Sequence, residues 1–352
     1  MIGYYAHQHG SGHLNFARLF AKVFGDEICT FSSLKKSGAM KGQFVQLADE
    51  NPDGTASEEN QIAEPDYLHY SPVGQRSIQL RSAQILKEVV ERNIKLMIVD
   101  VSVEIAALMR SSSIPYAYVK LPGHRDDAAH VQAFQGAVFV LAYYPEEFES
   151  EQTPVWLRKK TIYLGFITDR KIGQQITAAS EEVKNILVIS GGGGNERLLN
   201  AINVLPERFI SAEIRVIGMP KESFSSARIK NCGYVQNFQN LLEEADLVVA
   251  NCGLNSVTEI LQAKKAFVAI PEERPYREQE TTATHLYETD LAIDLNSLFD
   301  LEDSEILEHK TLNVDDELRA IKKLKDQISR NYGRLPLVPQ LFANQPKQQH
   351  AE

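Results

Sequence analysis

ADLVVANCGLNSVTE, residues 245–259, runs from an apolar segment through a glycine turn into a helical pattern. The unbroken apolar run 247–250 predicts a strand buried on both faces of a parallel sheet. Gly253 marks the turn, and Asn255, Ser256 and Glu259 follow it. N–H groups and hydroxyls at such a helix start suit a diphosphate, and a carboxylate one turn further on can accept two hydrogen bonds from a ribose diol. N-capping by Asn255 or Ser256, with Glu259 favoured by the helix dipole, explains the same residue types.

A second glycine turn precedes this one in the chain. The apolar run 186–189 leads through Ser190 into four consecutive glycines, Gly191, Gly192, Gly193 and Gly194, and then into a helical pattern. A plain turn needs one or two glycines, and four are costly in conformational entropy unless the backbone must approach something closely. We therefore predict anion or nucleotide binding at this turn.

A third loop, PEERPYREQE at residues 271–280, follows the apolar run 266–270. Ligands of open α/β sheets bind beyond the carboxyl ends of the strands, so this loop is expected at the same sheet edge as the two glycine turns. Taken alone, it is better explained as a solvated, charged loop. The convergence of three loops on one edge favours a ligand site.

Strand-like and helical segments alternate along the whole chain, in two halves. Apolar runs lie at 1–6, 28–31, 44–47, 96–99, 116–119 and 138–142 in the first half, and the second half adds 214–217 and 291–293. Helical patterns such as 77–92 and 103–110 lie between them, which predicts the α/β class with parallel sheets and crossover helices. We expect one domain over 1–165, a second over 166–334 whose final helix, 315–331, can pack back on the first, and a flexible tail over 335–352. The acidic, aperiodic stretch 49–66 is expected to be a long mobile loop.

The first glycine turn of the chain is Gly10-Ser11-Gly12-His13, between the run 1–6 and a helical pattern. Small residues there let backbone N–H groups face a ligand, although a tight turn with a capping serine has the same sequence. The motif is not the dinucleotide fingerprint GxGxxG, because Asn15 stands at the third glycine position. His7, His9 and His13 are close in sequence, but no carboxylate accompanies them, and we predict no metal site.

The composition excludes several classes of protein. Lys and Arg total 37 against 47 Asp and Glu, a net charge of −10, which argues against nucleic-acid binding and against docking on anionic lipid by bulk charge. The 3 cysteines are widely spaced without a CxxC, which disfavours a disulfide framework or structural zinc and favours a reducing cytoplasm. No basic segment precedes an apolar one at the N-terminus, and no apolar stretch reaches about 18 residues, so we expect neither a signal peptide nor a membrane-spanning helix.

Residues 251–279 resemble the donor-binding signature of nucleotide-sugar glycosyltransferases with two facing Rossmann-like domains, the GT-B fold. The similarity extends to UDP-glycosyltransferases and to the peptidoglycan N-acetylglucosaminyltransferase group of family 28. The Gly12 and Gly191–Gly194 turns, Gly233-Tyr234-Val235 and Leu164-Gly165-Phe166 also resemble segments of that group. The resemblance implies a cleft between two Rossmann-like domains, with the donor in the C-terminal domain and the acceptor in the N-terminal one.

The resemblance also implies a role for each candidate residue. Glu259 would bind the donor ribose, Asn255 and Ser256 would hold phosphate, and His13 would deprotonate the acceptor. Asn251 stands where UDP-glycosyltransferases usually place a histidine that contacts the diphosphate. The nucleotide base of the donor would be held near Val235. Glu278 and Gln279 would contact the hydroxyls of the donor sugar. The full donor-binding set is Gly12, Gly191, Gly192, Gly193, Gly194, Val235, Asn251, Gly253, Asn255, Ser256, Glu259, Glu278 and Gln279.

His13 and Asp100 are the predicted catalytic pair. They follow the runs 1–6 and 96–99, which parallel strands bring to one sheet edge. A neutral histidine can accept a proton near pH 7, and an adjacent carboxylate fixes its tautomer and stabilises the imidazolium. The likeness to UDP-glycosyltransferases implies a similar His–Asp pair. The alternatives are that Asp100 caps the helix 103–110 and that His13 only touches phosphate or caps its turn.

These observations predict an inverting, metal-independent glycosyltransferase of the hexosyltransferase type. The donor would be a UDP-sugar, and the acceptor a hydroxyl of a glycan, a lipid-linked glycan or a small molecule. No Asp-x-Asp metal-holding triplet occurs in the chain, and the nucleotide sugar is a substrate, so no metal or cofactor is expected. We expect no nucleic-acid partner, a cytoplasmic location and at most peripheral contact with the inner face of the membrane. A nucleotide-sugar epimerase of the same fold and a non-catalytic nucleotide-sugar binding subunit remain alternatives.

Overall fold

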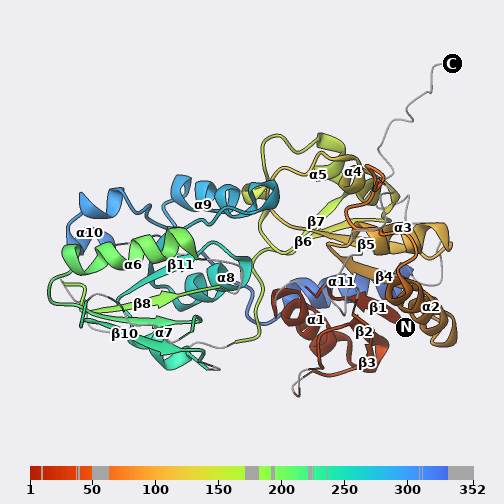
Figure 1. The fold of residues 1–352 in the computed structure, drawn as a ribbon, viewed down its shortest axis with the longest axis horizontal. Coiled ribbons are helices and arrows are strands. Elements are labelled where there is room, and N and C mark those ends of the chain that lie inside the picture. The colour runs from red at the N-terminus through yellow and green to blue at the C-terminus, as the bar shows by residue number, and fades with distance from the viewer. Residues whose placement is uncertain are drawn as a thin grey trace.

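Two parallel sheets organise the computed structural model (Figure 1), which describes residues 1–8, 11–36, 38, 40–49, 63–170, 182–191, 195–220, 224, 226–235, 237–308, 310 and 312–331. The first sheet has 7 strands in the order β3-β2-β1-β4-β5-β6-β7. They are β1 (Ile2–Tyr5), β2 (Ile28–Ser32), β3 (Gln43–Gln46), β4 (Leu96–Asp100), β5 (Tyr116–Lys120), β6 (Val140–Ala142) and β7 (Thr161–Tyr163).

The second sheet has 5 strands in the order β10-β9-β8-β11-β12. They are β8 (Asn185–Ile189), β9 (Glu213–Ile217), β10 (Ile229–Gly233), β11 (Leu247–Asn251) and β12 (Ala266–Ile270). The strand order reverses between β1 and β4 in one sheet and between β8 and β11 in the other. Ligands of open α/β sheets bind at such switch points, so the loops that follow these four strands are the first place to look for a site.

Helices connect the strands and cover the sheets (Figure 1), as the predicted α/β class with crossover helices requires. They are α1 (Ser11–Phe24), α2 (Arg76–Glu91), α3 (Val103–Ser111), α4 (Ala128–Gly136), α5 (Val155–Lys160), α6 (Glu196–Arg208), α7 (Gln239–Glu244), α8 (Leu254–Ala263), α9 (Glu278–Glu288), α10 (Asp303–Leu307) and α11 (Arg319–Asn331). Single 3₁₀ turns are η1 (Gly25–Glu27), η2 (Glu146–Phe148), η3 (Pro275–Arg277) and η4 (Ser297–Phe299).

The predicted strand at 291–293 is wrong. Only an isolated bridge forms there, between Val268 and Ile293. The ladder ends because Asp294 Oδ1 accepts the N–H groups of Asn296 and Ser297, at 2.9 and 3.2 Å, and turns the chain into η4. A side chain that bonds its own backbone competes with strand pairing.

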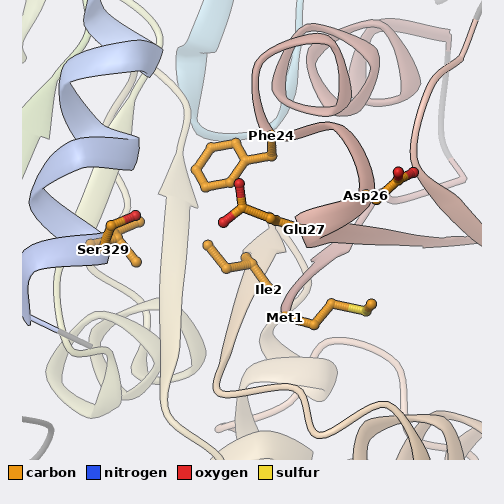
Figure 2. Close-up of a pocket in the computed structure, with 7 residues that line it drawn as sticks. Met1, Ile2, Phe24, Asp26, Glu27 and Ser329 are labelled. Atoms are coloured by element: carbon orange, nitrogen blue, oxygen red, sulfur yellow. The ribbon is translucent and has the colours of Figure 1, made fainter. Parts of the chain in front are cut away.

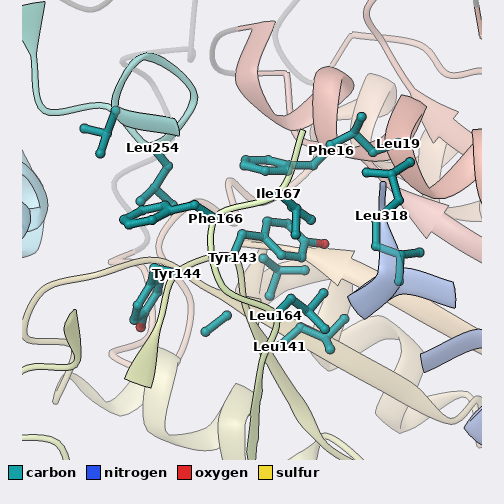
Figure 3. Close-up of a cluster of buried hydrophobic side chains, with 14 of the residues drawn as sticks. Phe16, Leu19, Leu141, Tyr143, Tyr144, Leu164, Phe166, Ile167, Leu254 and Leu318 are labelled. Carbon is teal, nitrogen blue, oxygen red and sulfur yellow. The ribbon is translucent and has the colours of Figure 1, made fainter. Parts of the chain in front are cut away.

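One apolar core extends from the first sheet to the second. Figure 3 shows Phe16 of α1, Phe166 and Ile167 of the segment after β7, and Leu254 of α8, which all belong to this cluster. The last helix, α11, joins the same cluster and packs beside α1, where Lys325 Nζ lies 2.5 Å from Glu27 Oε1. Burial of this shared surface holds the two sheets in one arrangement.

Several predictions fall outside the described residues: those on His9, Gly10, Gly192, Gly193 and Gly194, the tail 335–352 and most of the loop 49–66. Among the described helices, none combines the length and the apolar character needed to cross a bilayer.

Candidate active site

His13 and Asp100 face each other at the switch point of the first sheet. His13 is the third residue of α1, which follows β1, and Asp100 ends β4, the strand paired with β1. His13 Nδ1 lies 3.0 Å from Asp100 Oδ1. Tyr4 donates its hydroxyl to Asp100 Oδ2 at 3.0 Å, so the buried carboxylate is held from two sides. The predicted proximity of the two side chains is confirmed, and their catalytic role stays a prediction.

The surroundings of His13 favour its protonated form. Burial alone would lower the pKa of His13, but the charge of Asp100 and its hydrogen bond outweigh burial and raise that pKa. Because Nδ1 faces Asp100, Nε2 is the nitrogen that can take a proton from a substrate. The N-cap of α3 is Ser102, whose hydroxyl accepts the Ile105 N–H at 3.2 Å, so Asp100 does not have the capping role.

The start of α1 lies against the start of α8. Asn15 Nδ2 donates to Asn255 Oδ1 at 2.6 Å. A Cβ on Gly12 would lie 2.8 Å from Asn255 Nδ2, so a larger residue at position 12 would push the two helices apart. The N-cap of α8 is Gly253, so neither Asn255 nor Ser256 has that position. Two positive helix ends therefore meet next to His13, an arrangement that attracts an anion.

Glu259 lies on α8 just over one turn beyond Asn255, and 8% of it is exposed. Its Oε2 lies 2.9 Å from Nη1 of Arg170, which belongs to the segment that leads from the first sheet to the second. Burial raises the pKa of Glu259, and the Arg170 and Arg18 cations oppose that rise. The Arg170 guanidinium also lies 5.5 Å from the centroid of the Phe238 ring. A ribose that binds Glu259 must displace Arg170 or share the carboxylate with it.

The start of α6 is occupied by a carboxylate of the protein itself. Glu272 accepts the N–H groups of Leu198 at 2.8 Å and Arg197 at 3.2 Å, and it is only 4% exposed. Asn251 lies buried beside it, donating from Nδ2 to Glu272 Oε1 at 3.3 Å and accepting the Gly191 N–H at 2.9 Å. The positive end of α6 is therefore already neutralised, and Asn251 holds the backbone of Gly191 in place.

Gln279 belongs to the same network. Its Oε1 accepts the N–H of Cys252 at 3.3 Å and that of Glu272 at 2.9 Å, which ties the ends of β11 and β12 together. Because this oxygen is committed to the loops, any bond to a donor sugar falls to Nε2 of Gln279.

The loop after β5 contacts the loop after β12 from the other sheet. The His124 N–H donates to the Tyr276 carbonyl oxygen at 2.9 Å. Gly123 has φ +102°, and a Cβ there would lie 2.3 Å from the same oxygen. Only glycine permits both this backbone conformation and this approach. The His124 side chain itself points to Asp126, 2.9 Å away, and is 38% exposed, as expected for a surface residue.

Glu278 begins α9 beside this loop contact and near His13. Its Oε2 lies 3.5 Å from Arg125 Nη2. Burial raises the pKa of Glu278, while the positive charges of Arg125 and His13 counteract the rise. Glu278 is thus close enough to His13 to interact electrostatically with it.

Val235 and Gly191 complete the described part of the predicted donor set. Val235 lies just beyond β10 and is half-buried against the core, next to Tyr234, which is 74% exposed. A Cβ on Gly191 would meet only Asn251 Oδ1, at an ordinary 3.6 Å, so local space does not require glycine at position 191.

His69, Asp127 and His130 form a group of metal-ligating types beside the loop contact, with their ligand atoms within 4.8 Å of one another. Asp127 Oδ1 lies 2.9 Å from His69 Nε2, and Oδ2 lies 2.7 Å from His130 Nδ1. Arg125 Nη1 lies 3.3 Å from the other nitrogen of His130. Burial and the Arg125 cation lower the pKa of His130 to about 4. The sequence does not predict this group, because His69 lies on a loop far along the chain from Asp127 and His130.

A cavity of about 480 Å³ lies at the other end of the first sheet (Figure 2). Its lining comprises Met1, Ile2, Phe24, Asp26, Glu27, Ile328 and Ser329. Met1 and Ile2 lie at the amino end of β1, whereas the loops described above lie at the carboxyl ends. The cavity is therefore no part of the candidate active site.

Three residues that shape the site were not singled out from the sequence: Arg125, Arg170 and Glu272. The signal for Arg125 and Glu272 is their position directly after β5 and β12, on loops at the site edge. Arg170 has no such signal, because it reaches Glu259 only through the packing of the two sheets.

Residues 213–330 match the glycosyltransferase family 28 C-terminal domain, a range that includes Glu259, Glu272 and Glu278. No curated protein matches the chain.

Solved structures match the fold along almost the entire chain. MurG from Acinetobacter baumannii is 14% identical, with a TM-score of 0.56, and the match covers 94% of this chain and 100% of MurG. The spinosyn rhamnosyltransferase SpnG, complexed with thymidine diphosphate, is 13% identical with a TM-score of 0.60, over 94% of this chain and 96% of SpnG. The calicheamicin glycosyltransferase CalG4 is 12% identical with a TM-score of 0.58, over 95% and 98%. The chain has the GT-B fold of two Rossmann-like domains that these solved glycosyltransferases share, and its residues 213–330 are similar to the family 28 C-terminal domain.

Proposed function

We propose that the protein is an inverting, metal-independent glycosyltransferase that moves a hexosyl group from a UDP-sugar to an acceptor hydroxyl. The observation that carries the proposal is the His13–Asp100 pair at 3.0 Å, in which His13 belongs to α1, the helix whose start meets that of α8. A base next to two positive helix ends is suited to a single displacement in which a diphosphate leaves.

In the proposed mechanism, the acceptor oxygen attacks the anomeric carbon of the donor. His13 Nε2 takes the proton of the acceptor hydroxyl, and Asp100 stabilises the resulting imidazolium. Attack on the face opposite the leaving group inverts the anomeric configuration. The diphosphate leaves toward the start of α8, where Asn255, Ser256 and backbone N–H groups stabilise its charge without a metal ion.

The rest of the donor is assigned by position along the same edge. Glu259 accepts hydrogen bonds from the ribose hydroxyls, and Glu278 and Gln279 contact the sugar. We propose uridine as the base because of the resemblance of residues 251–279 to UDP-glycosyltransferases. The three cysteines are free thiols, which supports action in a reducing cytoplasm, with at most peripheral contact with the membrane. The proposed acceptor is a hydroxyl of a glycan, a lipid-linked glycan or a small molecule.

The proposal is tested first by thermal shift with UDP, TDP and GDP and with their hexose derivatives. A ligand at 100 times its dissociation constant that binds only the folded state stabilises it by about 2.7 kcal/mol. We expect the uridine compounds to shift the unfolding temperature most. Equal or absent shifts for all three nucleotides would contradict the donor assignment.

Transfer is then followed by NMR of the anomeric proton, with the bound UDP-hexose and a panel of acceptor alcohols and glycans. Inversion at the anomeric carbon is expected, and retention would overturn the mechanism. Conversion of the UDP-hexose into an epimer without acceptor would establish the epimerase. Binding with neither transfer nor slow hydrolysis would indicate a binding subunit.

A further inference from the structure

Arg125 is a buried cation at the candidate site whose hydrogen-bonding capacity is only partly used. Its side chain is 7% exposed. Nη1 lies 3.3 Å from His130 Nε2, and the guanidinium carbon lies 4.6 Å from the centroid of the Tyr276 ring. Nη2 lies 3.5 Å from Glu278 Oε2, which is too long for a good hydrogen bond. Nε has no hydrogen-bond partner anywhere in the described part of the chain.

The unused groups lie on one edge of the guanidinium. Nε–H and one N–H of Nη2 point the same way and form the fork with which arginine grips paired oxygens. His130 and Tyr276 fill a second edge and one face of Arg125, so the loosely bonded edge is the one toward Glu278. Leaving a buried donor without a partner is costly, and such donors are normally paired in the working state of a protein.

Glu278 supplies the complementary chemistry next to Arg125, from the other sheet. Its carboxylate accepts hydrogen bonds, whereas the edge of Arg125 donates them. Arg125 follows β5 of the first sheet, and Glu278 follows β12 of the second. The His124 N–H donates to the Tyr276 carbonyl oxygen at 2.9 Å and so holds the two loops together. This backbone contact sets the spacing between Arg125 and Glu278. Two neighbouring sugar oxygens can satisfy both groups, one as acceptor and one as donor.

We propose that Arg125 contacts the donor sugar and, with Glu278, forms a subsite for two neighbouring hydroxyl groups of a hexose. In this subsite the Nε and Nη2 edge of Arg125 donates hydrogen bonds to one sugar oxygen, and the Glu278 carboxylate accepts a hydrogen bond from the next hydroxyl. The inference rests on the proposed function and goes beyond it, because it places a residue of the acceptor-side sheet on the donor. The sugar is therefore gripped from both sheets at once.

The experiment compares the affinity of UDP with that of the UDP-hexose that binds best among UDP-glucose, UDP-galactose and UDP-N-acetylglucosamine. Isothermal titration is carried out on the wild type, Arg125→Gln and Arg125→Lys, with Arg277→Gln as matched control because Arg277 is an exposed arginine near the same loop contact. In the wild type the hexose is expected to add affinity beyond UDP. In Arg125→Gln we expect this gain to fall by about tenfold or more, since a charge-assisted bond is lost, while UDP affinity changes by less than about threefold.

The variant Arg125→Lys distinguishes a direct contact between Arg125 and the sugar from a purely structural role of Arg125. Arg125→Lys keeps the charge near Glu278 and over Tyr276 but loses the fork, so it should fold and still lose most of the hexose gain. The inference is overturned if the hexose still adds its affinity in both folded variants, or if it adds none in the wild type. In either case, binding of UDP leaves the proposed function standing. Failure of the wild type to bind UDP at all overturns the proposed function itself, and the inference with it.

Discussion

The starts of α6 and α8 both follow glycine turns at the carboxyl edge of the second sheet, yet they are in opposite states. At α6, Glu272 accepts two backbone N–H groups, and Asn251 bonds the same carboxylate. At α8, the N-cap is Gly253, no side chain caps the helix, and its first turn faces α1. One positive helix end is neutralised by the protein, and the other meets the helix that carries His13.

The two helix starts differ because some polar side chains at the strand ends bond the protein backbone and others do not. Glu272 and Gln279 are buried, with oxygens that accept backbone N–H groups of neighbouring loops. His13 instead has one nitrogen on Asp100 and the other available to a substrate. We therefore propose that the diphosphate binds at α8 and not at α6, a difference that substitutions around the two helix starts can test.

The largest effect is expected from His13→Ala. Without a base beside the start of α8, turnover should fall by about 10²–10⁴, while UDP affinity stays close to that of the wild type. Steady-state transfer kinetics and UDP titration measure the two quantities. His124→Ala is the matched control, because its exposed imidazole lies 2.9 Å from Asp126 and its backbone contact to Tyr276 remains. Normal turnover in His13→Ala would move the chemistry away from α8.

Glu272→Ala should strongly affect stability instead. The change leaves the Arg197 and Leu198 N–H groups at the start of α6 without their buried acceptor, which costs roughly 2–4 kcal/mol in the free energy of unfolding. Urea unfolding measures this loss, and the exposed neighbour Glu273→Ala should show almost none of it. If Glu272→Ala instead left stability intact and tightened UDP binding, α6 would be the diphosphate site and the comparison would be reversed.

Asp100→Asn tests the electrostatics of the base. Since Asp100 raises the pKa of His13, and a base must be neutral, kcat/KM of the wild type should rise with pH through a pKa above 6.5. Removing the carboxylate charge should move this limb to lower pH and reduce turnover by less than His13→Ala does. A pH profile of kcat/KM in both proteins measures the shift. An unmoved limb would show that the titrating group is not His13.

Glu259→Ala should weaken UDP binding by about tenfold, because the ribose loses a charge-assisted acceptor on α8. Arg170 now holds that carboxylate at 2.9 Å and is 44% exposed, so Arg170→Ala should raise UDP affinity by no more than a few-fold. Titration of both single variants and the double variant gives the coupling between them. Unchanged affinity in Glu259→Ala would leave Glu259 with a structural role only.

The sequence predicts the general architecture well, because unbroken apolar runs and glycine turns fix the strands and the edge where loops meet. It brings His13 to Asp100 for the same reason: the strand before each, β1 and β4, pair in parallel. The sequence cannot tell which helix start is neutralised by the protein. Glu272 and Glu278 are both glutamates of the charged segment 271–280, and nothing in that segment marks Glu272 as the one that bonds the start of α6. Their roles differ only because packing turns one carboxylate onto backbone N–H groups and the other toward Arg125.

Chelation is expected to have the smallest effect of all. If the positive ends of α1 and α8 stabilise the leaving diphosphate, transfer should proceed at an unchanged rate in EDTA. The group His69, Asp127 and His130 makes this test informative, because it holds metal-ligating atoms within 4.8 Å of one another. Asp127 hydrogen-bonds both His69 and His130, and Arg125 hydrogen-bonds His130. The positive charge of Arg125 opposes binding of a cation at His130. EDTA should therefore leave the pH profile of transfer unchanged too.

Loss of activity in EDTA can be traced further by adding single metals back and by the variant His130→Ala. Restoration by magnesium or manganese in both proteins would mean that a metal ion, and not the helix ends, stabilises the charge of the leaving diphosphate. The proposal that the diphosphate binds at the start of α8 would then lose its electrostatic basis. Restoration by zinc in the wild type but not in His130→Ala would instead locate the metal at the His69 group. That group lies beside the contact between the loops after β5 and β12, where a metal would support the cleft and not the leaving group.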